Sequence, residues 1–220
     1  MEMLKKFSLN EHGRDIAVGD VHGHFSKLES ELNRIHFDIS RDRLFFVGDL
    51  VDKGPESVEA SYWLGYPWAH AVRGNHDDYV VRHTTVQTSN WIRNGGAWFQ
   101  DLNDIEQSRL ARVFCKLPIA IQVETPAGLV GIVHAECPVD DWALLEERLA
   151  RKTVRSQAMW SRTRYESNDS SLIRGVHAVV CGHQPVPEKT LLGNTHFIDT
   201  AGWRDEGYFT LLDLHTLNSL

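Results

Sequence analysis

The motif GDLVDKG at residues 48–54 constrains the fold of this 220-residue chain more than any other feature. It follows the run RLFFV at 43–47, whose β-prone apolar residues are typical of a buried parallel strand. In open α/β sheets, ligands bind in the crevice outside the carboxyl ends of the strands. We therefore expect Asp49, Asp52 and Lys53 to lie in a functional site of an α/β protein.

Four other predicted strands also end in oxygen or imidazole donors. These donors are Asp20 and His22, then Asn75 and His76, then His134, and finally His183. The set Asp20, His22, Asp49, Asn75, His134 and His183 lacks thiolates, which suits Mn²⁺, Fe or Zn²⁺. We predict a binuclear metal site in which Asp49 bridges one ion held by Asp20 and His22 and a second held by Asn75, His134 and His183. Such a pair, ~3.5–4 Å apart, suits displacement at phosphorus.

The order of the predicted elements indicates two kinds of sheet. In the first half, strands at 16–18, 43–47 and 68–72 alternate with helices, which predicts parallel pairing with right-handed crossovers. Residues 79–116 are predicted to be helical and irregular, with a break at Asn94-Gly95-Gly96. The second half predicts a hairpin, a short helix and three further strands. The expected ranges are 119–124 and 129–133 for the hairpin, 142–150 for the helix, and 176–181, 195–198 and 208–214 for the strands.

We therefore expect an α/β protein with two stacked sheets flanked by helices. The sequence shows no internal repeat, low-complexity run or clear linker, which predicts a single domain over residues 1–220. The hydrophobic share of 42% and the charged share of 24% are typical of a soluble globular protein.

Charge and cysteine usage limit the partners and the compartment. The formal net charge of −7 argues against nucleic acid as the main partner, although a local basic pocket for phosphate stays possible. The amino-terminal residues lack the apolar core of a signal peptide, and no run approaches the ~18 apolar residues of a membrane span. Three cysteines form no paired framework, so we expect a reducing, cytoplasmic setting without membrane association.

Taken together, the motifs resemble a known family. GDVHG at 19–23, GDLVDKG at 48–54, RGNHD at 73–77, the lone His134 and GH at 182–183 resemble the phosphoprotein phosphatase branch of the metallophosphoesterases. The likeness is nearest to the small lambda-phage and bacterial Ser/Thr protein phosphatases. It implies a calcineurin-like α/β/β/α sandwich of two mixed sheets flanked by helices, and one-step hydrolysis of phosphomonoesters by metal-bound hydroxide.

The resemblance also implies roles for individual residues. Two divalent ions are expected, Mn²⁺ first with Fe or Zn²⁺ as alternatives, on the six ligands named above. His76 matches the general acid and Asp52 the carboxylate that orients it. The residues that match the family's phosphate-binding groups are Lys53, Arg73, Asn75 and Arg162. Expected substrates are phosphoproteins or phosphopeptides, with phosphotyrosine and small aryl phosphates as further substrates.

Three positions depart from the family pattern, and they bear on the substrate. Lys53 stands where the family usually has arginine, so the planar fork for bidentate phosphate binding is missing. Asp77 replaces the usual glutamate, as in diadenosine-tetraphosphate hydrolases, and residues 135–138 read Ala-Glu-Cys-Pro. A dinucleoside polyphosphate hydrolase is therefore the alternative, although 220 residues leave little room for a nucleotide-binding insert. An inactive phosphate-binding module is a further alternative, against which the complete set of ligands argues.

The tryptophans around the Gly95-Gly96 break have two interpretations. Trp91 and Trp98 are expected to belong to the aromatic core rather than to the walls of a substrate groove. Cys137 and Cys181 are likewise expected to be packed core thiols rather than redox groups.

Overall fold

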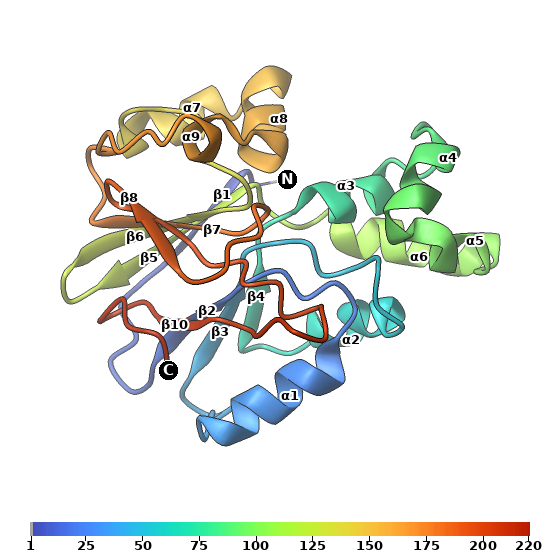
Figure 1. Cartoon of the computed structure of the whole chain (residues 1–220), viewed down its shortest axis with the longest axis horizontal. Coiled ribbons are helices and arrows are strands. Elements are labelled where there is room, and N and C mark those ends of the chain that lie inside the picture. Colours follow the sequence, from blue (N-terminus) through green and yellow to red (C-terminus); the bar gives the residue numbers. More distant parts are fainter. Residues whose placement is uncertain (1) are drawn as a thin grey trace.

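The structure is a computed structural model that describes residues 2–220, and it contains two β-sheets (Figure 1). The larger sheet has six strands in the order β1-β5-β6-β7-β9-β8, and the smaller has four in the order β10-β2-β3-β4. The strands of the larger sheet are β1 (Leu4–Phe7), β5 (Ala120–Thr125), β6 (Gly128–Val133), β7 (Ala178–Cys181), β9 (Thr195–Phe197) and β8 (Thr190–Leu192). Those of the smaller sheet are β10 (Leu211–Asp213), β2 (Asp15–Val18), β3 (Arg43–Phe46) and β4 (Ala69–Ala71).

The smaller sheet contains the predicted parallel strands. β2 pairs parallel with β3, and β3 pairs parallel with β4, while β10 closes the other edge antiparallel to β2. Helix α1 (Phe25–Arg34) connects β2 to β3 and buries Phe25, Leu28 and Leu32. The parallel β-α-β-α-β start is therefore confirmed.

The larger sheet is built around the predicted hairpin. β5 and β6 pair antiparallel, with Thr125 opposite Gly128 at the turn, and β7 adds parallel to β6. The strands at the two edges, β1 and β8, were not predicted. In β1 the two central residues are Lys5 and Lys6, which interrupt the apolar pattern, and only Leu4 is fully buried.

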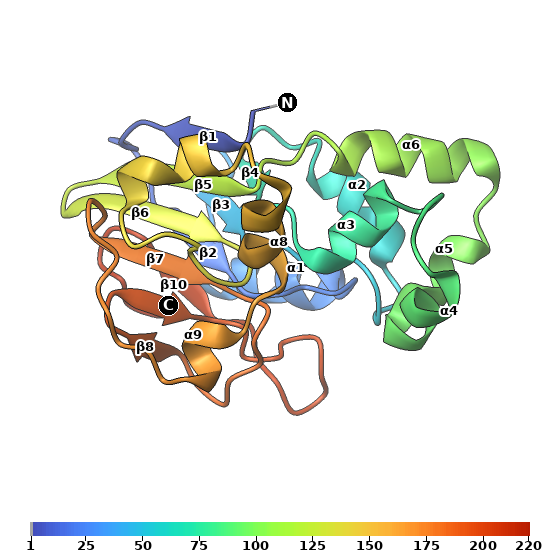
Figure 2. The ribbon, with the colours of Figure 1, turned by 90° about the horizontal axis from the view of Figure 1, so that it is seen from above.

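The two sheets stack face to face, and helices cover both outer faces (Figure 1). Seen from above, α1 lies behind the strands, at the far side of the molecule (Figure 2). A core of inward-facing residues, including Phe45, Val130 and Val180, fills the space between the sheets. Further helices are α2 (Ala60–Trp63), α3 (Asn75–Val81), α6 (Asp104–Phe114), α7 (Leu145–Arg148), α8 (Lys152–Trp160) and α9 (Thr163–Glu166). The first three belong with α1 to the core beside the smaller sheet, whereas α7 and α8 pack on the larger sheet. The expected α/β fold with two mixed sheets flanked by helices is confirmed.

The middle of the chain forms a helical lobe beside the sheets. Its elements are α3 and α6 together with α4 (Thr88–Trp91), the irregular turn Ile92–Gly96 and α5 (Ala97–Gln100). The predicted break is present, because Gly95 has a φ of +100°. Residues that carry a side chain rarely adopt this backbone conformation. A Cβ on Gly95 would lie 2.4 Å from the amide nitrogen of Lys53. The glycine therefore lets this lobe approach the loop after β3.

None of the helices found in residues 2–220 combines the length and the apolar character needed to cross a bilayer.

Candidate active site

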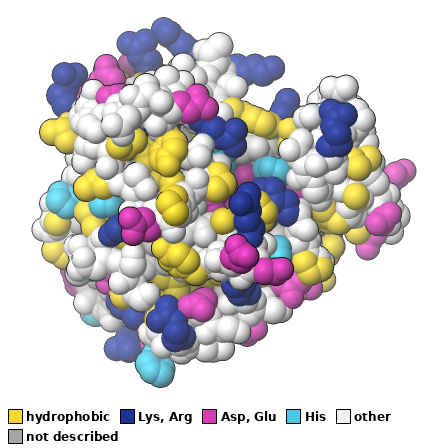
Figure 3. Space-filling view, in the orientation of Figure 1, with side chains coloured by type: hydrophobic (Ala, Val, Ile, Leu, Met, Phe, Trp, Pro, Cys, Tyr) yellow, Lys and Arg dark blue, Asp and Glu magenta, His cyan; other side chains and the backbone are white. Residues whose placement is uncertain are grey.

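The loops that leave the strands meet in one cavity of about 290 Å³. Asp20 and His22 follow β2, Asp49 follows β3, and His183 follows β7, as expected for the carboxyl ends of neighbouring strands. The residues that line the cavity are Asp20, His22, Asp49, Lys53, Asn75, His76, Arg162, His183, Pro185, Asp199, Trp203 and Arg204. In the space-filling view the surface is hollowed between the sheets and the helical lobe, and basic and histidine side chains gather there (Figure 3).

Asp49 lies at the centre of two groups of donor atoms. One group joins His22, Asp49 and His76, and the other joins Asp49, His134 and His183, each with donor atoms within 4.8 Å of one another. The Oδ2 atom of Asp49 lies 3.6 Å from His22 Nε2, and its Oδ1 atom lies 3.3 Å from His134 Nε2. This carboxylate therefore has the position that a ligand shared by two ions requires.

Two other predicted ligands complete the cluster. The Oδ2 atom of Asp20 lies 3.9 Å from His22 Nε2, and the Asp20 carboxylate accepts from the backbone N–H of His183. The amide oxygen of Asn75 lies 2.8 Å from His134 Nε2. The structure thus brings all six predicted ligands to one place, and it also brings His76 beside them.

Backbone carbonyl groups orient two of the imidazole rings. The Nδ1 atom of His22 lies 2.8 Å from the carbonyl oxygen of Val51, and the Nδ1 atom of His134 lies 2.8 Å from that of Val47. A proton on each Nδ1 atom makes these contacts hydrogen bonds. The Nε2 atom of His22 then lies 2.7 Å from Lys53 Nζ, and that of His134 faces the amide oxygen of Asn75. Outer contacts of this kind hold metal-binding histidines in one tautomer.

The electrostatics of the cavity suit divalent cations. Burial raises the pKa of Asp20 well above its usual value, and the charges of Asp199 and Asp49 raise it further. Burial also raises the pKa of Asp199, and it lowers the pKa of His22 well below 6.5. Burial alone would lower the pKa of His134, but the Asp49 carboxylate raises that pKa to about 9, so this ring carries a proton that a divalent cation would displace. Buried carboxylates crowded beside imidazoles form a donor set that a divalent cation stabilises, so the residues present fit metal binding.

Asp52 and His76 form a buried pair beside this cluster. The Nδ1 atom of His76 lies 2.6 Å from Asp52 Oδ2, and the His76 Nε2 atom lies 3.9 Å from Asp49 Oδ2. Two indoles hold Asp52 from the other side: Trp91 Nε1 donates to Oδ2 at 2.8 Å, and Trp98 Nε1 donates to Oδ1 at 2.7 Å. The expectation that both tryptophans belong to the aromatic core is therefore incomplete, because both also orient this carboxylate.

We expect Trp98→Phe to lower kcat about tenfold on alkyl phosphates, the substrates that the resemblance implies. The substitution keeps an aromatic ring but removes one of the charge-assisted hydrogen bonds that hold Asp52, each worth ~1.5–3 kcal/mol. Steady-state kinetics with Trp68→Phe as the control would check it, since Trp68 lies under α1, away from Asp52. Equal kcat values for the two variants would remove Trp98 from this role.

Asp77, one of the departures from the family pattern, supports the loop that carries Asp49. Its carboxylate accepts from the backbone N–H groups of Asp49 at 2.9 Å, Leu50 at 3.0 Å and Gly74 at 2.8 Å. Asp77 is fully buried and does not line the cavity. The shorter side chain therefore acts on the position of Asp49 and does not face a substrate.

Several residues of the site have backbone conformations that favour glycine. The non-glycine residues of the site with positive φ are His22 (45°), Asp49 (50°), Asp52 (72°), Lys53 (66°) and His183 (65°). Left-handed residues of this kind cost roughly 1–3 kcal/mol each and concentrate at functional sites. The turns after three different strands therefore share one strained geometry that aims side chains at the cavity.

The cations predicted to bind the phosphoryl group divide between two places. Lys53 and Arg162 line the cavity, with Lys53 Nζ 2.7 Å from His22 Nε2 and 3.9 Å from the ring centroid of Trp203. Arg73 does not line it, so its contact with a phosphoryl group stays a prediction. The Arg73 guanidinium donates to the carbonyl oxygen of Cys115 at 2.8 Å and pairs with Asp78, which turns it toward a different cavity.

Four cavity residues were not predicted from the sequence, and one of them is Pro185, two residues after His183. Asp199, Trp203 and Arg204 come from the chain after β9, where no glycine-rich motif marks them. The Arg204 guanidinium lies 4.5 Å from the ring centroid of Trp203, which places a further cation at the cavity. Tertiary packing alone brings this segment beside the loops after β2 and β3.

Comparison with known proteins places the chain among phosphatases. Residues 16–191 match the family model described as calcineurin-like phosphoesterase. A curated protein named serine/threonine-protein phosphatase 1, from Salmonella typhimurium, is 34% identical over 187 residues, which cover 83% of this chain and 84% of that protein.

Proteins named for tetraphosphate hydrolysis match less of the sequence. A symmetrical bis(5'-nucleosyl)-tetraphosphatase from Pseudomonas putida is 32% identical over 143 residues, which cover 58% of this chain and 43% of that protein. The crystal structure of a putative diadenosine tetraphosphatase superposes with a TM-score of 0.72 and covers 100% of this chain and 97% of that one. At 21% identity this likeness concerns the fold.

Proposed function

The chain belongs to the calcineurin-like phosphoesterase family of metal-dependent hydrolases, and we propose that it is a protein phosphatase that removes phosphate from serine and threonine side chains. The observation that carries the proposal is the buried Asp52–His76 pair, which faces the donor groups that share Asp49. A proton donor beside a cluster of metal-binding side chains is the arrangement that hydrolysis of an alkyl phosphate requires.

We propose two divalent ions, Mn²⁺ by preference, in the cavity. Asp20, His22 and Asp49 would hold one ion, while Asp49, Asn75, His134 and His183 would hold the other. When bound, the ions would supply Lewis-acid activation of water and of the phosphoryl group.

The remaining residues position the substrate and handle its proton. Arg162 and Lys53 would hold the phosphoryl oxygens with the amide of Asn75, because all three line the cavity. His76 would donate a proton from Nε2 to the leaving alkoxide, while Asp52 stabilises the imidazolium through Nδ1. The two indoles that donate to Asp52 keep this pair in one orientation.

Protein phosphatase is favoured over dinucleoside polyphosphate hydrolase by the comparisons. The phosphatase from Salmonella typhimurium aligns over 84% of its own length, whereas the tetraphosphatase from Pseudomonas putida aligns over 43%. We also propose that residues 1–220 act as one catalytic domain in the cytoplasm, where the cysteines Cys115, Cys137 and Cys181 stay free as the structure has them.

A turnover assay with Mn²⁺ tests the function. A neutral phosphoserine peptide, p-nitrophenyl phosphate and diadenosine tetraphosphate would be compared at equal enzyme concentration, with phosphate and nucleotide release both measured. Of the two biological substrates, we expect the phosphoserine peptide to have a higher kcat/KM than diadenosine tetraphosphate. Faster release of ADP from the tetraphosphate would replace the proposal with the dinucleotide function, and no turnover of any substrate would leave only a binding module.

Lys53 provides a test of phosphate binding. Lys53→Ala should lower kcat/KM on phosphomonoesters about 10- to 100-fold, because it removes a charge-assisted contact worth ~1.5–3 kcal/mol. Lys53→Arg should raise it, because a guanidinium adds the planar fork that lysine lacks. Lys189→Ala is the matched control, since Lys189 lies outside the cavity and donates to the Leu217 carbonyl oxygen. Parent-like kinetics of Lys53→Ala would mean that Arg162 holds the phosphoryl group without it.

A further inference from the structure

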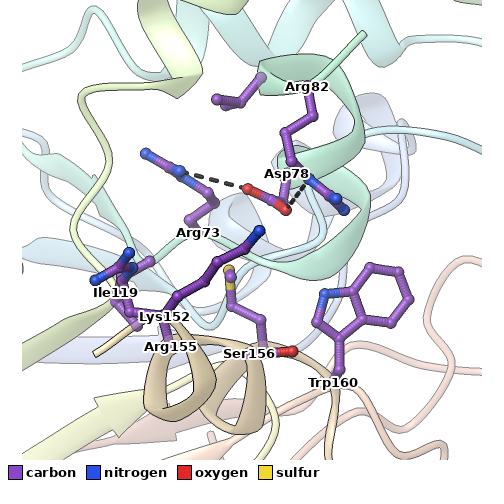
Figure 4. A pocket seen from close by; sticks show the side chains of 10 residues that line it. Arg73, Asp78, Arg82, Ile119, Lys152, Arg155, Ser156 and Trp160 are labelled. Atoms are coloured by element: carbon purple, nitrogen blue, oxygen red, sulfur yellow. Dashed lines mark hydrogen bonds and ion pairs between the residues drawn. The ribbon is translucent and has the colours of Figure 1, made fainter. Parts of the chain in front are cut away.

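A second cavity, of about 260 Å³, lies between α3 and α8 (Figure 4). Four cationic side chains line this α3–α8 cavity, with one carboxylate: Arg73, Arg82, Lys152, Arg155 and Asp78. The chain as a whole carries a formal net charge of −7. A concentration of positive charge on an acidic protein marks this cavity as selective for anions.

The one carboxylate of the cavity is already shared by two arginines. Arg82 Nε donates to Asp78 Oδ2 at 2.6 Å, and Arg73 Nη1 donates to Asp78 Oδ1 at 3.4 Å. Dashed lines in Figure 4 mark both contacts. The charges of Lys152 and Arg155 are therefore left for a ligand to neutralise.

Lys152 and Arg155 differ in their hydrogen bonds and exposure, but both are available to a ligand. Arg155 Nη1 donates to the carbonyl oxygens of Leu149 at 2.8 Å and Ala150 at 2.9 Å, which holds the guanidinium beside the cavity. Lys152 is exposed at the start of α8. Across residues 2–220 neither side chain has an ion pair with a carboxylate.

The α3–α8 cavity is connected to the active site by both of its helices. Helix α3 begins with Asn75 and His76 in the active site and reaches the second cavity with Arg82. Helix α8 ends at Trp160, which lines the second cavity and whose carbonyl oxygen lies 3.3 Å from His183 Nε2. With a rise of 1.5 Å per residue, the part of α8 from Arg155 to Trp160 spans about 7.5 Å and the part from Lys152 to Trp160 about 12 Å.

An extended peptide covers about 10 Å, a length between these two values, in roughly three residues, since each adds ~3.3 Å. We propose that the α3–α8 cavity binds an anionic side chain, a carboxylate or a second phosphate, located about three residues from the phosphorylated residue of a protein substrate. This inference rests on the proposed phosphatase function. Arginine and lysine would contact the anion, while Ile119, Met159 and Trp160 supply apolar walls for the aliphatic part of the side chain.

The test compares phosphoserine peptides that differ only three residues from the phosphoserine, on either side. Alanine, aspartate or a second phosphoserine would occupy that position, and kcat/KM would be measured for each. We expect the aspartate or the doubly phosphorylated peptide to exceed the alanine peptide by about three- to tenfold on one side, through KM. The peptide with the larger increase in kcat/KM shows whether the cavity prefers a carboxylate or a phosphate. The ratio should fall toward one in high salt, because screening weakens partly exposed charge pairs.

Two variants with the same change of net charge locate the effect. Lys152→Gln should bring the ratio of anionic to alanine peptide close to one, whereas Arg151→Gln should leave the ratio intact. Arg151 is the exposed neighbour that precedes α8 and does not line the cavity.

Equal kcat/KM for all peptides, or a ratio that survives Lys152→Gln, would overturn the inference and leave the phosphatase function standing. If diadenosine tetraphosphate is cleaved and no phosphopeptide is, the proposed function fails and the inference fails with it.

Discussion

Asp49→Asn should abolish binding of the metal pair and hydrolysis together. Asp49 is the one residue that the structure places in both groups of donor atoms found in residues 2–220, and an amide supplies one oxygen where the carboxylate supplies two. We expect kcat to fall by more than about 100-fold. Loss of a residue that only supports a metal ligand typically costs up to about 100-fold, and loss of the shared ligand itself should cost more. Metal content by mass spectrometry and turnover of p-nitrophenyl phosphate would be measured on the same preparation.

Asp42→Asn is the matched control for this prediction. Asp42 is also a buried aspartate, but it pairs with Arg14 outside the cavity, so its loss should lower thermal stability and leave metal content unchanged. An Asp49→Asn protein that keeps two tightly bound ions and normal turnover would refute the shared-ligand assignment.

His76→Asn should lower kcat on alkyl phosphates by ~10²–10⁴-fold, the usual contribution of a general acid. The loss should be smaller for p-nitrophenyl phosphate, whose leaving group needs little protonation. Metal content should stay at the parent level, and this measurement matters because the structure also places His76 within 4.8 Å of the donor atoms of His22 and Asp49.

His83→Asn serves as the control for His76, since His83 follows α3 and contacts the Val80 carbonyl oxygen outside the cavity. Loss of one ion from His76→Asn would make His76 a ligand. Equal losses of kcat on both substrates would remove it from the acid role.

The layers of the fold and the convergence of the six predicted ligands were accessible from the sequence because both depend on local pattern. A strand that ends in Gly-Asp or Gly-His marks a turn at one edge of a sheet, and parallel strands bring such edges together. The missing elements lack that pattern. β1 contains two lysines in four residues, and α8 buries only Ala158 and Met159, so neither has a clear apolar period.

Contacts between distant segments were not accessible in the same way. Trp91 and Trp98 are 39 and 46 residues from Asp52, and nothing in their spacing shows that their N–H groups meet one carboxylate. The direction in which the Arg73 side chain points could not be predicted from the sequence either. Its position in RGNHD suggested phosphate binding, but the carbonyl oxygens after α6 and the carboxylate of Asp78 draw its guanidinium to the other side of α3.

The left-handed turns of the site imply that substitutions which stabilise this protein can also reduce its activity. At five positions of the site, residues to which we assign the chemistry have backbone angles that glycine would adopt without strain. Each costs the folded state roughly 1–3 kcal/mol, a large share of the ~5–15 kcal/mol that separates a typical native domain from its unfolded chain. A search for heat-resistant variants without a turnover screen would therefore enrich substitutions at these turns and select catalytically dead proteins. The melting temperature of this enzyme is consequently a poor guide to its fitness.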